Sequence, residues 1–244
     1  MKKCLEITTK IGCMCNCFYC PQDKLLKNYP DGASKQLDIL DLQLHILKKI
    51  PKDVKIHFSG FCEPFLNFDC INMIKAVYDR GYKVGLYTTT VGMIELDIFL
   101  LKKMEINPFV VHRIPNILYA DVVDENIRLL DKHEIEYEII TVSKNDGENK
   151  QKMVSRAGNS DCIKHRYIDG PIRCKDNREY QNVMLPNGDV YLCCQDYSLE
   201  NKVGNLFTDS YEDLHKSDVF QLVLDKMDSK KDVVCRKCFR AVKK

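Results

Sequence analysis

The chain has 13 cysteines among 244 residues, and the densest group of them has the spacing of a reactive metal site. Cys13, Cys17 and Cys20 form the pattern CxxxCxxC within the sequence GCMCNCFYCP. Three thiolates at this spacing can bind three corners of a [4Fe–4S] cube and leave one iron without a protein ligand. An open coordination position is typical of a reactive metal site rather than a structural one. A zinc finger is disfavoured, because the spacing is wrong and no matching pair of histidines follows.

A second group of cysteines lies near the end of the sequence. Cys174 is followed by Gly188 and Cys193, and the group closes with Cys235 and Cys238 in the sequence CRKC. Four thiolates can ligate a second cluster completely, and the same four could equally hold a structural zinc ion. The ligands alone leave these two alternatives open.

Composition excludes several other functions. The clustering and the odd number of cysteines argue against disulfides and favour metal or redox chemistry in a reducing compartment. The net charge of +2 predicts neither a nucleic-acid nor a membrane partner. No run of about 18 apolar residues and no signal-peptide pattern occurs, so we expect a cytoplasmic protein.

A parallel sheet is expected to position these cysteines. Apolar runs alternate with helix-length segments along the chain, and this pattern indicates a sheet built from βαβ units. Strands are expected at 5–11, 54–58, 83–88, 108–112 and 137–142. Helices are expected at 37–50, 71–78, 94–104 and 122–133, the first from the spacing of Leu37, Leu40, Leu44 and Leu47.

The pattern changes from about Pro171 onward, where a small appended domain is expected to begin. Two apolar runs, 183–185 and 189–192, flank Asn187 and Gly188, which favour a tight hairpin turn. Such a hairpin would bring Cys193 back toward Cys174.

The spacing CxxxCxxC, with the aromatic Tyr19 before its last cysteine, resembles the signature of the radical S-adenosylmethionine (SAM) superfamily. The resemblance implies an α/β fold with a partial (β/α)6 barrel. It also implies that the open iron binds the amino and carboxylate groups of SAM, with Tyr19 beside the cofactor. One electron from the cluster would then cleave SAM to a 5′-deoxyadenosyl radical, which abstracts hydrogen from a substrate.

The sequence SGFCEP at 59–64, after the second expected strand, is similar to the Gly-Gly-Glu element of this superfamily. The resemblance implies that Gly60 and Glu63 hold the methionine ammonium of SAM. Cys62 stands where a glycine is usual, and it is either a small buried residue or a thiol near the chemistry.

Polar residues at the ends of the third and fourth expected strands match further cofactor positions of the superfamily. Thr88 and Thr89 would contact the methionine or ribose of SAM, His112 would contact the ribose, and Tyr87 would reach the substrate. A strand end rich in threonine is also ordinary β structure, and a histidine there is often structural.

The second cysteine group resembles the twitch domain, the shorter relative of the SPASM domain, which carries an auxiliary [4Fe–4S] cluster. The resemblance divides the chain into a radical SAM barrel at 1–165 and a twitch domain with a β-hairpin at 166–244. In this comparison the Gly-x4-Cys spacing favours Cys193 over its neighbour Cys194 as the ligand. Two [4Fe–4S] clusters and SAM are therefore the expected cofactors.

Chain length and motif spacings are most similar to the small SPASM/twitch dehydrogenases that oxidise an aminocyclitol, 2-deoxy-scyllo-inosamine. The resemblance implies that Arg156 and the pair Cys194 and Gln195 contact a sugar-like or cyclitol-like substrate. An acidic residue is usual where Gln195 stands, which argues against the same cationic substrate. An electron donor such as flavodoxin or ferredoxin is implied as partner, and the auxiliary cluster would accept the second electron of an alcohol oxidation.

Three alternatives stay open. An epimerase would use a thiol such as Cys194 to return hydrogen to the opposite face of the substrate. A peptide-modifying enzyme fits less well, because the expected barrel begins almost at residue 1 and leaves no room for a leader-recognition domain. A zinc-stabilised binding module would have no catalytic activity.

Overall fold

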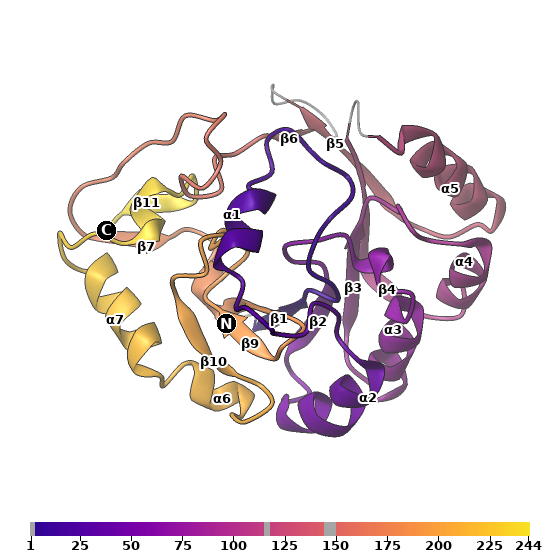
Figure 1. Cartoon of the computed structure of the whole chain (residues 1–244), viewed down its shortest axis with the longest axis horizontal. Coiled ribbons are helices and arrows are strands. Elements are labelled where there is room, and N and C mark those ends of the chain that lie inside the picture. Colours follow the sequence, from indigo (N-terminus) through magenta and orange to yellow (C-terminus); the bar gives the residue numbers. More distant parts are fainter. Residues whose placement is uncertain (1–2, 115–117, 144–149) are drawn as a thin grey trace.

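A computed structural model describes residues 3–114, 118–143 and 150–244, and a nine-stranded sheet is its central element (Figure 1). Across this sheet the strands follow the order β10-β9-β8-β1-β2-β3-β4-β5-β6. Their bounds are β1 (Cys4–Ile7), β2 (Lys55–Phe58), β3 (Val84–Thr88), β4 (Ile106–Arg113), β5 (Glu138–Ser143), β6 (Lys150–Lys152), β8 (Gln181–Met184), β9 (Asp189–Tyr191) and β10 (Lys202–Asn205). A separate two-stranded sheet pairs β7 (Ile172–Cys174) with β11 (Ala241–Lys243).

The helices lie mostly between the strands of the first half of the chain. The α-helices are α1 (Gln22–Asn28), α2 (Ile39–Asp41), α3 (Cys70–Asp79), α4 (Glu95–Leu101), α5 (Ala120–Lys132), α6 (Tyr211–Leu214) and α7 (Asp218–Met227). Short segments of other helical type are η1 (Leu42–Ile46), η2 (Leu47–Lys49), η3 (Pro64–Leu66), η4 (Arg178–Tyr180) and η5 (Val234–Lys237).

The strands β1 to β6 all run parallel, and helices α3, α4 and α5 cover the outer side of the sheet (Figure 1). This confirms the expected α/β fold with a partial barrel. Each of the five expected strands is present, and the first is shorter than expected because it ends at Ile7. The sixth strand, β6, follows β5 after residues 144–149, which lie outside the described part of the chain.

Alternation along the parallel strands separates an apolar outer face from a polar inner face. Leu5 and Ile7 of β1 are completely buried in the core that the helices cover, whereas Glu6 between them points to the other face. The parallel register places His57 of β2 opposite Glu6, so the two side chains share that inner face. The sheet therefore supplies polar side chains to the inside of the barrel.

The prediction of one regular helix over 37–50 is wrong in its details. The segment is split between α2, η1 and η2, which have three different hydrogen-bonding patterns. Leu40 and Leu44 are 60% and 55% exposed, while Leu42 and Ile46 are completely buried. The wider turn of η1 shifts the buried face away from the stripe that a regular helix would give.

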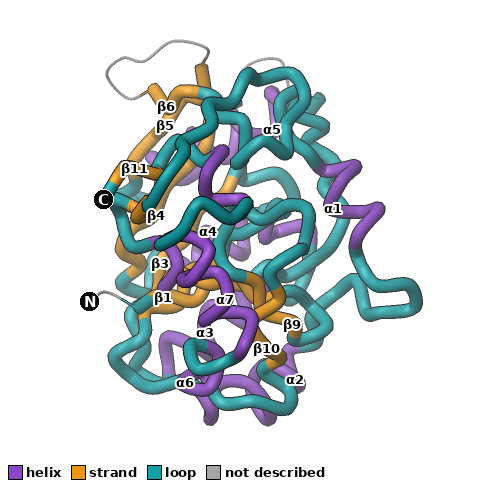
Figure 2. Tube along the Cα trace, turned by 90° about the vertical axis from the view of Figure 1, so that its left-hand side faces the viewer, coloured by secondary structure: helices purple, strands orange, loops and turns teal. Residues whose placement is uncertain are grey.

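The C-terminal region extends the barrel sheet. β8 and β9 form the expected antiparallel hairpin, and β8 also pairs in parallel with β1. The segment between β6 and β7, residues 153–171, is entirely loop and turn (teal in Figure 2). Helices α1, α6 and α7 were not expected from the sequence.

Candidate functional site

The first cysteine group lies in the loop between β1 and α1. Cys13, Cys17 and Cys20 are all partly exposed, and the backbone N–H of Cys20 donates to the carbonyl of Cys17 at 2.9 Å. Cys15 is buried, and its Sγ lies 3.4 Å from Oγ1 of Thr89. A hydrogen bond from the Cys15 thiol lowers the pKa of Cys13, which favours the thiolate form that binds metals. All 13 thiols are free of disulfides.

Glu63, Thr88 and Thr89 meet beside this loop. Oε1 of Glu63 accepts a hydrogen bond from Oγ1 of Thr88 at 2.5 Å, and Oε2 accepts from both the N–H and Oγ1 of Thr89, at 2.6 and 2.7 Å. Burial raises the pKa of Glu63 to about 7, although these hydrogen bonds act in the opposite direction. The carboxylate is thus fixed in a polar cradle at the ends of two neighbouring strands.

Gly60 allows the turn that brings Glu63 to this position. Its φ of +100° belongs to the region that side chains disfavour, and an added Cβ would lie 2.2 Å from Oγ1 of Thr8. The Thr8 hydroxyl also accepts a hydrogen bond from the N–H of Phe61 at 3.2 Å. Cys62 accepts a hydrogen bond from the Gln22 side chain at 3.2 Å, so its thiol faces helix α1.

Three aromatic rings follow one another along the inner face of β2, β3 and β4. The Tyr87 ring centroid lies 5.4 Å from that of His57 and 6.1 Å from that of His112. Burial lowers the pKa of both histidines to about 4, so both are neutral at pH 7. Tyr19 is not part of this row but is buried against Cys15.

The second cysteine group surrounds a common cavity. It is lined by Cys174 at the end of β7, Cys193 after β9, and Cys235 and Cys238 at either end of the CRKC segment. In the described residues no three His, Cys, Asp or Glu side chains are arranged to hold a metal ion. The four thiols nevertheless line one cavity, so they can act together as ligands of one metal centre.

Cys194 does not line this cavity. Its Sγ instead accepts hydrogen bonds from Nη1 of Arg178 at 3.5 Å and from Nε2 of Gln195 at 3.7 Å. Arg156 lies on the same side of the molecule, with its guanidinium 5.8 Å from the centre of the Tyr197 ring. Burial alone would lower the pKa of Arg156, but Tyr197, Cys194 and other acidic side chains raise it, so the guanidinium stays charged.

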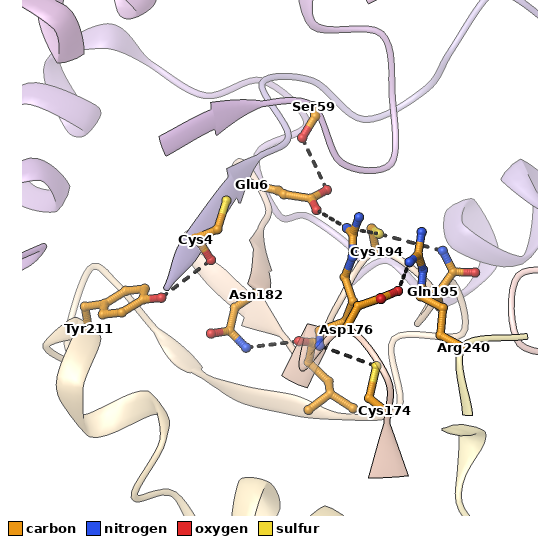
Figure 3. A network of polar contacts seen from close by, with 12 residues as sticks. Cys4, Glu6, Ser59, Cys174, Asp176, Asn182, Cys194, Gln195, Tyr211 and Arg240 are labelled. Atoms are coloured by element: carbon orange, nitrogen blue, oxygen red, sulfur yellow. Dashed lines mark hydrogen bonds and ion pairs between the residues drawn. The ribbon is translucent and has the colours of Figure 1, made fainter. Parts of the chain in front are cut away.

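The structure also reveals a buried ion pair that the sequence analysis did not identify. Glu6 accepts a hydrogen bond from Nη1 of Arg178 at 3.1 Å and another from Oγ of Ser59 at 3.2 Å (Figure 3). Burial raises the pKa of Glu6, and Arg178 opposes that shift. The N–H of Arg178 donates to Sγ of Cys174 at 3.4 Å, so this arginine links the second cysteine group to the barrel. A carboxylate inside an apolar strand is the one signal in the sequence that could have pointed to Glu6.

Comparison with known proteins relates the chain to one group of enzymes. Residues 174–239 match the SPASM family, described as an iron–sulfur cluster-binding domain. The structure of BtrN in complex with AdoMet and 2-DOIA is 17% identical with a TM-score of 0.64, over 94% of this chain and 88% of that one. SuiB from Streptococcus suis bound to the precursor peptide SuiA is 15% identical with a TM-score of 0.66, over 92% and 67%.

Native anSMEcpe with bound AdoMet is 14% identical with a TM-score of 0.59, over 97% of this chain and 86% of that one. A comparison with curated protein sequences gave no match. The resemblance to SPASM/twitch radical SAM enzymes is thus confirmed at the level of the fold, and the C-terminal region carries the cluster-binding domain. In the described residues no helix has the length and apolar character needed to cross a membrane.

Proposed function

We propose that this chain, which has the fold of the radical SAM enzymes and carries a SPASM-type domain, is a radical SAM dehydrogenase that oxidises a small alcohol. The observation that carries the proposal is the buried carboxylate of Glu63, held by Thr88 and Thr89 next to the CxxxCxxC loop. With bound cofactors, this site would supply a 5′-deoxyadenosyl radical that removes hydrogen from carbon.

The residues of the chain bind and orient these cofactors. Cys13, Cys17 and Cys20 would hold the first cluster. Glu63 would hold the ammonium of SAM, because its carboxyl group is buried and fixed in place by hydrogen bonds from Thr88 and Thr89. Gly60, Thr88 and Thr89 fix the position of Glu63, while Tyr19 and His112 are further candidates for contact with SAM. The test is SAM binding by equilibrium dialysis: Glu63→Gln should weaken it at least about tenfold, and Glu105→Gln, at the far end of β4, should not.

The second cluster is proposed to use Cys174, Cys193, Cys235 and Cys238, because these four line one cavity and Cys194 does not. Anaerobic reconstitution followed by iron and sulfide analysis tests this assignment. Cys193→Ala should remove the second cluster, whereas Cys194→Ala should keep it. Loss of the cluster from the Cys194 variant alone would reverse the assignment, and zinc without sulfide would support the binding-module alternative.

An alcohol oxidation is favoured over other radical reactions because the chain carries, besides the CxxxCxxC loop, a second group of four cysteines that line one cavity. Hydrogen abstraction from a carbinol carbon leaves one electron and one proton still to be removed. A second cluster that is fully ligated by protein is suited to accept an electron rather than to bind substrate. The structure of BtrN with AdoMet and 2-DOIA supports this choice by its shared fold.

An epimerase is the second candidate, and the orientation of Cys194 favours it. Cys194 is not among the residues that line the cavity of the second cysteine group, and its Sγ instead accepts a hydrogen bond from Arg178. A thiol that holds no cluster is available to return hydrogen to a substrate. Turnover in deuterated water distinguishes the two reactions. A dehydrogenase gives a carbonyl product, whereas an epimerase places deuterium at the inverted carbon and stops when Cys194 is replaced by Ala.

The substrate itself is best sought with a panel that also includes peptides, because SuiB with its precursor peptide shares the fold. Formation of 5′-deoxyadenosine above the substrate-free level, with sugars, cyclitols and peptides in parallel, identifies the substrate class. Flavodoxin and ferredoxin should be compared as electron donors in the same assay. A peptide as the sole active member of the panel would overturn the small-alcohol proposal.

A further inference from the structure

The inner face of the barrel carries a continuous polar wall across β1, β2 and β3. The register places Glu6, His57 and Gly85 side by side on β1, β2 and β3, with Tyr87 two residues further along β3. Gly85 leaves room for the imidazole, because an added Cβ would lie 2.6 Å from Cδ2 of His57. The wall therefore runs from the Glu6 carboxylate through the His57 ring to Tyr87.

Several polar atoms around this wall are buried without a hydrogen-bond partner. In the described part of the chain these include Nε2 of His57, Nε of both Arg156 and Arg178, and Oε1 of Gln195. Arg178 and Gln195 also line the cavity of the second cysteine group, whereas His57 and Arg156 do not. Because buried polar atoms normally find partners, the unpaired atoms of His57 and Arg156 point to a ligand outside that cavity, which Arg178 and Gln195 can also reach. The two guanidinium groups can only donate and the Gln195 oxygen can only accept, so a matching ligand must do both. Hydroxyl groups meet that requirement.

The ion pair between Glu6 and Arg178 in this wall can form further hydrogen bonds with such a ligand. Glu6 is only 6% exposed, and one of its oxygens accepts a hydrogen bond from Arg178 while the other accepts one from Ser59. A carboxylate can accept about four, and Nε of Arg178 is still free. A carboxylate and a guanidinium group side by side can thus bind adjacent hydroxyls of one molecule.

The same pairing determines which charge the site accepts. Because Arg178 already neutralises Glu6, an ammonium group would gain no free carboxylate here and would meet the second guanidinium group, that of Arg156. Asn159 donates to the carbonyls of both Arg156 and Gln195, and the side chains of Gln195 and Arg178 both donate to Sγ of Cys194, so Arg156 lies in the same region as the ion pair. A cationic ligand is therefore disfavoured.

We propose that Glu6 and Arg178 bind the substrate, and that this substrate is a polyhydroxylated small molecule without an ammonium group. The assignment rests on the radical SAM function proposed above and adds a substrate class to it. It differs from a purely structural ion pair in predicting that exchange of either charge changes which small molecule binds.

The experiment measures binding of radiolabelled myo-inositol and glucosamine to the anaerobically reconstituted, SAM-loaded protein by equilibrium dialysis. The wild-type protein should bind myo-inositol at least about tenfold more tightly than glucosamine. Glu6→Gln should weaken myo-inositol binding about 10- to 100-fold, because hydrogen bonds to a buried charge are lost. Arg178→Gln frees the carboxylate and should reverse the preference in favour of glucosamine.

The matched control is Asp189→Asn, which removes another buried carboxylate of the same sheet. Asp189 is paired with Lys202 and contacts Asn187 and Asn205 in the hairpin, on a strand separated from β1 by β8. Its probe binding should match the wild type. Iron content reports whether each variant keeps its clusters, and Glu6→Gln tests the assignment even if Arg178→Gln loses one.

Substrate-free formation of 5′-deoxyadenosine with dithionite separates this inference from the function on which it rests. Absence of SAM cleavage in the wild-type protein would refute the proposed function, whatever the probes do. If SAM is cleaved but both variants bind the two probes as the wild type does, the ion pair is structural only. Tighter wild-type binding of glucosamine than of myo-inositol, or no binding of myo-inositol, would likewise overturn the substrate class.

Discussion

Arg236 lies within the CRKC segment, and we predict that its replacement by Met destabilises the C-terminal region by about 4 kcal/mol. The side chain is completely buried, and its guanidinium group donates to five backbone carbonyls. The carbonyls are those of Ile168, Gly170, Lys226, Ser229 and Lys231. These contacts join the segment before β7 to the turn after α7, so they hold Cys235 and Cys238 against Cys174.

The magnitude follows from the acceptors that lose their donor. A buried acceptor without a partner costs about 1–3 kcal/mol. The carbonyl of Lys226 also accepts from the N–H of Ser229, which leaves four that depend on Arg236. At about 1 kcal/mol each the loss is about 4 kcal/mol, and relief from burying a charge could reduce it to about 2 kcal/mol.

Chemical denaturation of the anaerobically purified protein, followed by circular dichroism, measures this loss together with iron content per chain. The control is Lys231→Met, which removes a neighbouring cation whose side chain is exposed and should change stability by less than about 0.5 kcal/mol. Arg236→Lys should recover part of the loss, because an ammonium group offers three donors. Equal denaturation midpoints and iron contents for the Met variants of Arg236 and Lys231 would refute the reasoning.

Three further predictions concern the barrel. Gly60→Ala should lower the thermal midpoint far more than Gly81→Ala, because both have positive φ but only at Gly60 would Cβ meet a side chain, at 2.2 Å; equal shifts would contradict the steric account. His57 has its pKa lowered to about 4 by burial, so the unfolded state binds more protons and stability falls below pH 6.5. Between pH 7 and 5.5 the wild type should lose about 1 kcal/mol more than His57→Gln in urea denaturation. Tyr82→Phe should cost about 1–2 kcal/mol in the same assay, because its hydroxyl group lies 2.7 and 2.8 Å from the carbonyl oxygens of Leu47 and Ile50, at the two ends of η2, and donates to them; no loss would exclude that role.

Much of the fold could be predicted because buried parallel strands are recognisable in a sequence as short apolar runs between helices. The convergence of Glu63 with Thr88 and Thr89 follows from the same regularity, since both strand ends meet at one edge of the sheet. The buried face predicted for the segment 37–50 was wrong because sequence periodicity assumes a regular α-helix. The segment η1 has a wider turn, which changes which side chains are buried.

The polar wall could not be predicted from local patterns. Glu6 is visible as a charge inside an apolar strand, but its partner Arg178 lies 172 residues away along the chain. The choice between Cys193 and Cys194 has a similar cause. Adjacent residues at a strand end turn to opposite sides, and which side faces the second cysteine group depends on a register that the sequence does not state.

The pairing of β1 with β8 has a consequence for the synthesis of the protein. Among the described strands β1 is synthesised first, yet the neighbour on one of its edges begins only at Gln181. At about 5–20 residues per second, the nascent chain waits roughly 10–35 s before that edge can close. During this interval that edge of β1 offers unpaired N–H and C=O groups to other chains, so the first half of the barrel is open to edge-to-edge association until β8 has been made.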